Sequence, residues 1–296
     1  MVRYQAPSYN SPVRQAASPR RNQTRIEKEG QFVMELRQAI GNRRSIRYLD
    51  PEKPVEIEKI QRMLEAARIA SHFGNNSAAC ALVVHRATAT DEQIASLHSP
   101  VGGFQMKLAP VIILWYVEGA AMDEAGDRLR ELVDCGALGY GPNKRKELEE
   151  TLVPLFSRIG EALRLPGMVD MDLGQAVAQA TLMAFELGLG TCCQGSADWS
   201  LVEKAFGLPD GCRIVVAQTV GYPLESADGG GQRPRRPFEH LFRLNSHDTP
   251  FPRSEAVVDE LTSDGLFQKL AASTPEREAE IEAIRKKYDL PGSGMI

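Results

Sequence analysis

Apolar side chains follow two patterns along the chain, one with helical spacing and one continuous. The helical spacing predicts helices at residues 32–40, 55–69, 91–97, 171–188 and 199–206. Short apolar runs predict strands at residues 81–85, 109–117 and 214–220. A further helix is expected to begin at Thr274-Pro275, because a capping threonine followed by proline is the preferred order at a helix start.

The order of these elements indicates an α+β protein with helices on both faces of a sheet, because few connections look like regular right-handed crossovers. A doubly wound dinucleotide fold would carry GxGxxG after its first strand, and the sequence has neither this pattern nor a Walker loop. The segment 171–188 is apolar or small nearly all the way round, which is typical of a core or interface helix. Its end at Gly188 suits the left-handed conformation that often follows a helix.

Composition divides the 296 residues into three parts. Residues 1–30 are rich in Arg, Pro, Ser and Gln without apolar periodicity, which predicts an arm that is disordered or draped over a partner. Residues 31–245 are expected to form the folded domain, and the polar residues 246–296 a C-terminal extension. The charged, helical stretch between residues 118 and 170 has no role that the sequence assigns.

Charge and cysteine usage narrow the class of function. A net charge of −4 gives no general attraction to nucleic acid or anionic membranes, so an anion site must be local. No apolar run approaches 18 residues and the N-terminus lacks a signal-peptide pattern, so we expect a cytoplasmic protein without a membrane partner. The five cysteines form no CxxC and the five histidines are scattered, which predicts a reducing compartment and no metal site.

Two arginine clusters are the strongest candidates for binding chemistry. The first is Arg43-Arg44-Ser45-Ile46-Arg47, between a helix and a turn bounded by prolines. It is either a solvated basic turn, since helix C-termini attract cations, or a phosphate cradle built from guanidinium groups. The second is Arg233-Pro234-Arg235-Arg236-Pro237, which its prolines hold extended. Two such clusters around an apolar core favour an anion site.

Four ordered pieces between residues 35 and 245 resemble the nitroreductase family of FMN-dependent oxidoreductases. They are the first arginine cluster, the polar loop around Asn75, the helix end Gly188-Leu189-Gly190-Thr191-Cys192, and Gly221-Tyr222-Pro223 followed by Arg233 and Arg235. The resemblance implies a nitroreductase-like α+β fold: a central, mostly antiparallel sheet flanked by helices in an intertwined homodimer.

The same resemblance implies how FMN is held. The cofactor-binding residues that it implies are Arg43, Arg44, Ser45, Arg47, Asn75, Ser77, Leu189, Gly190, Thr191, Arg233 and Arg235. Charge-assisted bonds from the arginines at both clusters suit the FMN phosphate. Arg47 would face the pyrimidine edge, where a cation stabilises the negative charge of the reduced ring. Asn75 would act across the dimer interface, and glycine at 190 would let the backbone approach the ring.

The loop at residues 71–77 departs most from the family pattern and points to a specialised substrate. His72 and Phe73 stand where the family has two serines. His72 either lines the substrate site as a proton donor near neutral pH or packs beneath the loop. No side-chain acid is otherwise required, because the flavin carries the hydride chemistry.

The resemblance implies that NAD(P)H reduces FMN, which then passes electrons to a second small molecule by a ping-pong mechanism. The acceptor would be a nitroaromatic, a quinone or a narrower substrate. One alternative is an FMN-dependent dehydrogenase or oxidase, or a flavin-modifying enzyme, that uses oxygen. Another is a flavin-binding or scaffolding homologue without catalysis.

Overall fold

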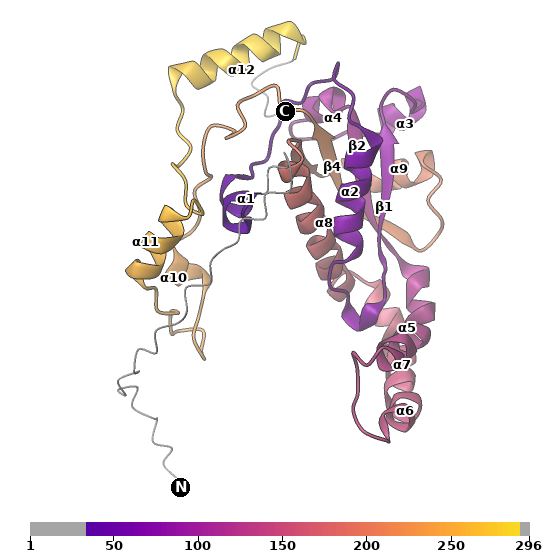
Figure 1. Ribbon diagram of the computed structural model, residues 1–296. Helices are drawn as coiled ribbons and strands as arrows, with labels where there is room; N and C mark the ends of the chain where they lie inside the picture. Colours follow the sequence, from indigo (N-terminus) through magenta and orange to yellow (C-terminus); the bar gives the residue numbers. More distant parts are fainter. Residues whose placement is uncertain (1–33, 291–296) are drawn as a thin grey trace, which may run out of the picture. The chain divides into compact units, whose positions relative to one another are not determined.

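A four-stranded antiparallel sheet forms the centre of the protein. The computed structural model describes residues 34–290 (Figure 1). The predicted N-terminal arm, residues 1–30, and the first two residues of the predicted helix 32–40 lie outside this range. The strands are β1 (Ala79–His85), β2 (Val111–Glu118), β3 (Gly190–Gln194) and β4 (Cys212–Gly221), in the order β1-β2-β4-β3. Every neighbouring pair is antiparallel, which confirms the mostly antiparallel sheet.

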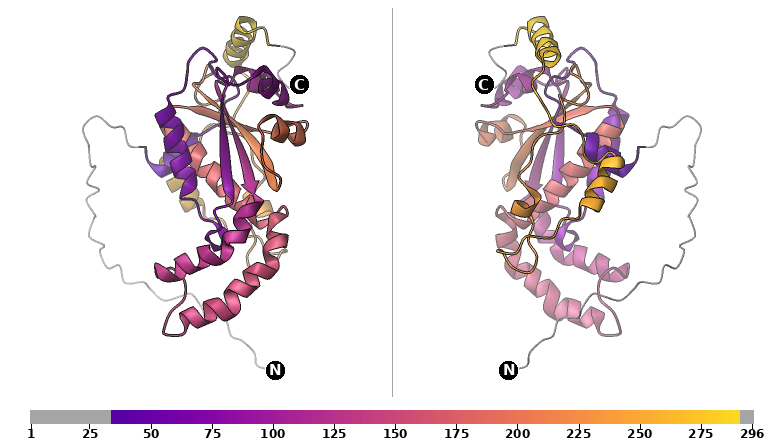
Figure 2. Two further views of the ribbon diagram at one scale, coloured as in Figure 1. Left: turned by 90° about the vertical axis from the view of Figure 1, so that its right-hand side faces the viewer. Right: turned by 90° about the vertical axis from the view of Figure 1, so that its left-hand side faces the viewer.

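Helices cover both faces of this sheet, as the sequence predicts (Figure 2). Alternate residues of β2, from Val111 to Val117, pack against α2 (Ile57–Arg68) and α8 (Met168–Glu186). Ile112 and Leu114 face the other way, toward the layer that contains α9 (Trp199–Ala205) and the residues beside α3 (Asp91–Ser96). A strand buried on both faces needs apolar residues at every position, and this explains the continuous apolar run.

The predicted helices occur within a few residues of their expected bounds, and their ends have physical causes. They are α1 (Leu36–Asn42), α2, α3, α8, α9 and α12 (Pro275–Lys287). After α8, Gly188 adopts φ 75°, a left-handed conformation that glycine reaches without strain. Before α12, the Thr274 hydroxyl accepts a hydrogen bond from the Arg277 amide, and Pro275 opens the first turn.

Several short elements complete the described residues. They are α4 (Phe104–Leu108), α5 (Ala125–Asp134), α6 (Lys144–Glu147), α7 (Val153–Arg164), α10 (Phe238–Leu241), α11 (Glu255–Ser263), the 3₁₀ turns Phe73–Asn75 and Gly119–Glu124, and the π turn Leu148–Leu152. The stretch between β2 and α8 is therefore helical, as expected. Among residues 34–290, no helix is both long and apolar enough to span a membrane.

The helices α5 and α7 pack over the loop that follows α2 (Figure 2). The Phe156 ring on α7 stacks on Phe73 with 5.2 Å between ring centroids. Gly74 adopts φ 60°, and a Cβ atom there would lie 2.5 Å from the Phe156 ring. Glycine is thus required both by the backbone conformation and by the aromatic ring above it.

Candidate functional site

The first arginine cluster lies alongside β3. Ser45 forms an isolated parallel bridge with Thr191, and the Ile46 amide donates to the Thr191 carbonyl at 3.0 Å. A Cβ atom on Gly190 would lie 2.8 Å from the Ile46 Cβ, so this approach requires glycine. The structure therefore brings together two of the pieces that the sequence singled out, the Arg43–Arg47 segment and the strand that begins at Gly190.

Arg44 turns into the protein and is held by backbone carbonyls. Arg44 is 6% exposed, and its guanidinium donates to the carbonyls of Gly41, Arg43 and Gly231 at 2.6, 2.9 and 3.1 Å. Burial, followed by the nearby charge of Arg43, lowers the pKa of Arg44. Within residues 34–290 no carboxylate forms an ion pair with it. The nearby charge of Asp228 acts in the opposite direction and raises the pKa of Arg44, but it does not outweigh burial and the neighbouring arginines. The buried cation is thus only partly compensated, which makes this a place where an anion is stabilised.

Arg233, from the second cluster, is held around the same loop. It donates to the carbonyls of Gly229 and Gly231 at 2.7 and 3.3 Å. A Cβ atom on Gly229 would lie 3.2 Å from the Arg44 Cβ and 3.5 Å from an Arg233 nitrogen. Burial, and next the charge of Arg47, lower the pKa of Arg233. The two clusters, almost 190 residues apart in sequence, therefore meet in one cationic site.

Three consecutive glycines make this meeting possible, and sequence reasoning missed them. Gly229, Gly230 and Gly231 have φ values of 55°, 82° and 112°. This backbone region is rarely occupied by residues with a side chain. The loop they form places carbonyl groups between Arg44 and Arg233. The run Gly-Gly-Gly was a visible signal, because three adjacent glycines are expected where a backbone adopts unusual angles close to other groups.

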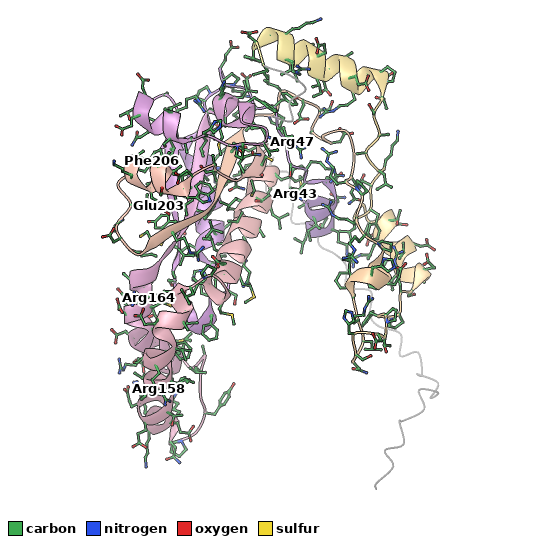
Figure 3. All side chains as sticks on the ribbon, turned by 180° about the vertical axis from the view of Figure 1, so that it is seen from behind. Arg43, Arg47, Arg158, Arg164, Glu203 and Phe206 are labelled. Atoms are coloured by element: carbon green, nitrogen blue, oxygen red, sulfur yellow. The ribbon has the colours of Figure 1, made fainter. Side chains whose placement is uncertain are left out.

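The remaining arginines of the two clusters have little internal pairing. Arg43 and Arg47 are half-buried on the segment that follows α1 (Figure 3). Among the described side chains, neither guanidinium forms a hydrogen bond or an ion pair with another residue. Arg235 is exposed and its guanidinium reaches only the carbonyl of Pro234, at 3.2 Å. Arg236 is exposed as well, and its guanidinium makes no hydrogen bond or ion pair with another described residue. These four guanidinium groups are therefore available for a bound anion.

The loop at residues 71–77 is fixed to α8 by a buried network. Asp172 is fully buried and accepts hydrogen bonds from the Phe73 amide and the Asn76 side chain at 2.9 and 3.2 Å. Asn75 adopts φ 57° and is half-buried, whereas Asn76 is 3% exposed. The Nε2 atom of His72 is buried, without a hydrogen-bond partner among the described residues. Ser77 is exposed, with φ 54°.

The arginine site and this loop lie toward opposite ends of α8. Asp172, in the second turn of the helix, holds the loop, whereas Leu187 and Gly188 end the helix just before Gly190. At 1.5 Å per residue, the fifteen steps from Asp172 to Leu187 correspond to about 22 Å. Within one chain the structure therefore does not bring Asn75 and Ser77 to the arginines.

Comparisons with known proteins bear on the family and the fold. The model of the nitroreductase family matches residues 153–222, from α7 to the turn after β4, which confirms the resemblance to that family. None of the curated proteins matches the chain.

Three solved structures illustrate the shared fold. One is an Exiguobacterium sibiricum protein described as a nitroreductase in complex with FMN, 21% identical over 73% of this chain and 99% of the other, with a TM-score of 0.56. A Staphylococcus epidermidis protein described as an NAD(P)H:FMN oxidoreductase is 16% identical over 72% and 96%, with a TM-score of 0.58. A Desulfovibrio desulfuricans protein described as a nitroreductase in complex with FMN is 24% identical over 74% and 100%, with a TM-score of 0.50.

Proposed function

We propose that this chain, which has the nitroreductase fold and matches the nitroreductase family model over residues 153–222, is an FMN-dependent oxidoreductase. The observation that carries the proposal is the cationic site around Arg44. A buried guanidinium that forms no ion pair among the described residues, flanked by Arg43 and Arg233, suits a phosphate group better than a neutral ligand. Two of the solved structures with this fold are FMN complexes.

Each part of the site has a distinct role in this proposal. Arg43, Ser45, Arg233 and Arg235 would hold the FMN phosphate, and Arg44 would orient the backbone around it. Arg47 would place its charge at the pyrimidine edge of the ring. The backbone from Leu189 to Thr191 would line the ring, because Gly190 leaves space beside it. FMN, when bound, supplies the hydride chemistry, and the residues of the chain orient it and stabilise its charge.

We further propose that NAD(P)H is the electron donor and that a nitroaromatic, a quinone or a more specialised molecule is the acceptor, in a ping-pong sequence. One of the structures with this fold is described as an NAD(P)H:FMN oxidoreductase, which supports the donor. The five cysteines are free, which supports a reducing, cytoplasmic compartment.

A homodimer would complete the site. The loop with Asn75 and Ser77 is held about 22 Å along α8 from the arginine end, so one chain's loop would serve the other chain's flavin. Leu36 and Ile40 on α1 and Met168 and Met171 on α8 are exposed apolar side chains, which supports an interface along these helices. Met171→Glu is therefore expected to give monomers with weakened FMN retention, measured by sedimentation velocity and flavin fluorescence.

The central test is an FMN titration with a matched pair of variants. Arg235 and Arg236 are neighbours in sequence, and both are exposed. Arg235→Ala should raise the FMN dissociation constant about tenfold or more, since one charge-assisted hydrogen bond contributes roughly 1.5–3 kcal/mol. Arg236→Ala should change the FMN dissociation constant less than about twofold, because the proposal assigns a phosphate contact to Arg235 and none to Arg236.

Two outcomes would overturn the proposal in different ways. If saturating FMN gives neither bound flavin nor thermal stabilisation, the protein is not a flavoenzyme. If flavin binds but neither NADH nor NADPH bleaches it anaerobically, the reductase proposal fails. An enzyme that instead reduces its flavin with an organic substrate and reoxidises it with oxygen would be a dehydrogenase or oxidase.

A further inference from the structure

A buried carboxylate lies directly behind the backbone of the first arginine cluster. The Glu225 side chain is 2% exposed. Its Oε1 atom accepts hydrogen bonds from the Arg47 amide at 2.5 Å and from the Tyr48 amide at 3.1 Å. Glu225 therefore fixes the backbone that carries the Arg47 side chain, although it lies almost 180 residues away in sequence.

The charge of Glu225 is compensated by the C-terminal helix. Arg277, on α12, forms an ion pair with Glu225 and a second one, at 2.7 Å, with Glu280. Burial alone would lower the pKa of Arg277, but its hydrogen bonds with these two carboxylates outweigh burial and raise it. Glu280 in turn accepts from the amide and the hydroxyl of Ser226, both at 2.6 Å. The start of α12 is thus tied to residues 225–226 by charged hydrogen bonds.

Apolar contacts place α12 against the same segment. The Tyr48 ring stacks on Phe104 with 4.9 Å between centroids, and Ile281 and Ile284 of α12 pack against this pair. The residue next to Arg47 is therefore held from two sides: through its backbone by Glu225 and through its ring by the α12 cluster.

Arg277 also lies beside the glycine loop that orients the other arginines. A Cβ atom on Gly230 would lie 3.3 Å from the Arg277 Nε. The carbonyls on either side of Gly230, those of Gly229 and Gly231, are the acceptors for Arg233 and Arg44. One side chain of α12 thus borders both halves of the cationic site.

We propose that α12 is a part of the flavin site, in which Glu225 and Arg277 are positioning residues that hold the Arg47 backbone and the glycine loop in their binding conformation. The proposal rests on the proposed function. Its physical basis is that removing one partner of a buried ion pair leaves the other charge without compensation, so the surrounding backbone rearranges. A preorganised cluster of like charges needs such support, because its members repel one another.

The test uses the full chain with Arg277→Met, and Lys286→Met as the matched control on the same helix. Lys286 is 76% exposed and pairs only with Glu282 among the described residues. Arg277→Met should raise the FMN dissociation constant about tenfold or more, and Lys286→Met should change it less than about twofold. Arg277→Met should also make the midpoint potential of bound FMN more negative, because the charge of Arg47 is less well placed. Arg277→Lys, which keeps the positive charge, should show smaller changes in both the FMN dissociation constant and the midpoint potential.

Hydrogen exchange in the flavin-free protein separates this proposal from the proposed function. Arg277→Met should speed exchange at the Arg47 and Tyr48 amides, and Lys286→Met should not. If exchange there is unchanged, or if FMN affinity and potential stay at wild-type values while only the melting temperature falls, α12 has a purely structural role and the proposal is wrong. If wild-type protein binds no FMN, the proposed function fails together with any flavin role for α12.

Discussion

Asn76 and Asn75 are neighbours with opposite expected roles, and a pair of substitutions separates stability from flavin chemistry. Asn76 is almost fully buried, and its side chain makes three hydrogen bonds. The side-chain NH2 group donates to the Phe73 carbonyl at 2.7 Å and to the Asp172 carboxylate at 3.2 Å, and the side-chain oxygen accepts from the Ala78 backbone amide at 2.9 Å. Asn76→Ala removes all three. At roughly 1 kcal/mol for each net hydrogen bond, the free energy of unfolding should fall by about 3 kcal/mol.

Asn75 is the matched control, because its left-handed backbone is the main constraint that the described structure places on it. With φ 57°, it tolerates glycine without strain, so Asn75→Gly should change the free energy of unfolding by less than about 1 kcal/mol. If Asn75 reaches the flavin of a partner chain, the same substitution should weaken FMN binding or slow turnover.

Urea denaturation of the flavin-free protein gives the stabilities, and flavin fluorescence gives the affinities. A loss of less than about 0.5 kcal/mol in Asn76→Ala, the usual range for a surface substitution, would show that the three hydrogen bonds contribute little to stability. Equal destabilisation of the two variants would contradict the different roles assigned to Asn75 and Asn76. A stable Asn75→Gly variant with wild-type FMN affinity and turnover would remove Asn75 from the proposed site.

Three further predictions follow from buried groups. The indole N–H of Trp115 donates to the Gln218 side-chain oxygen at 2.9 Å, and Gln218→Leu removes this acceptor. The free energy of unfolding, measured by urea denaturation, should therefore fall by about 2 kcal/mol. An unchanged urea midpoint would contradict this prediction. Gly190→Ala places a Cβ atom 2.8 Å from the Ile46 Cβ, so it should lower the melting temperature and weaken FMN retention together. A variant as stable as wild type would show that the segment around Ile46 can shift without loss of stability. Burial raises the pKa of Cys80 from its ordinary value of 9.0 to about 11, so the folded chain keeps a proton that the unfolded chain releases. Stability should therefore fall as the pH rises from 9 to 11, and by more in wild type than in Cys80→Ala; equal slopes would refute the shift.

The sheet shows what apolar patterning can and cannot predict. The strand β2 is a continuous apolar run, and burial on both faces leaves no other choice of residues, so its position follows from the sequence. The strand β3 was missed, because Gly-Thr-Cys-Cys-Gln has almost no strand signal of its own. It is extended because β4 pairs with one side of it and the Ser45–Ile46 segment with the other.

For the arginine site, too, some features could be predicted from the sequence and others could not. The residue types of the two arginine clusters favoured an anion site, and the structure places Arg44 of one cluster and Arg233 of the other at the same loop, residues 229–231. Which arginine turns inward could not be predicted, since Arg43 and Arg44 are chemically identical. The choice depends on carbonyl groups of Gly41 and Gly231, whose positions are set by the turn after α1 and by the glycine loop. The roles of Arg43, Arg47 and Arg235 toward FMN remain predictions.

The polar composition of the C-terminal extension, residues 246–296, suggested no role for it. In the structure, however, the extension contacts the chain on both sides of the first arginine cluster. At the N-terminal side, Arg37 on α1 forms ion pairs with Glu260 and Asp264 at the end of α11, and a side chain at Gly41 would collide with the backbone of Gly265. At the C-terminal side, α12 packs against Tyr48. The segment between these two points, residues 42–47, carries every arginine of the cluster. Because the strands of the sheet pair without help from the extension, its removal should affect the placement of these arginines more than the fold of the core.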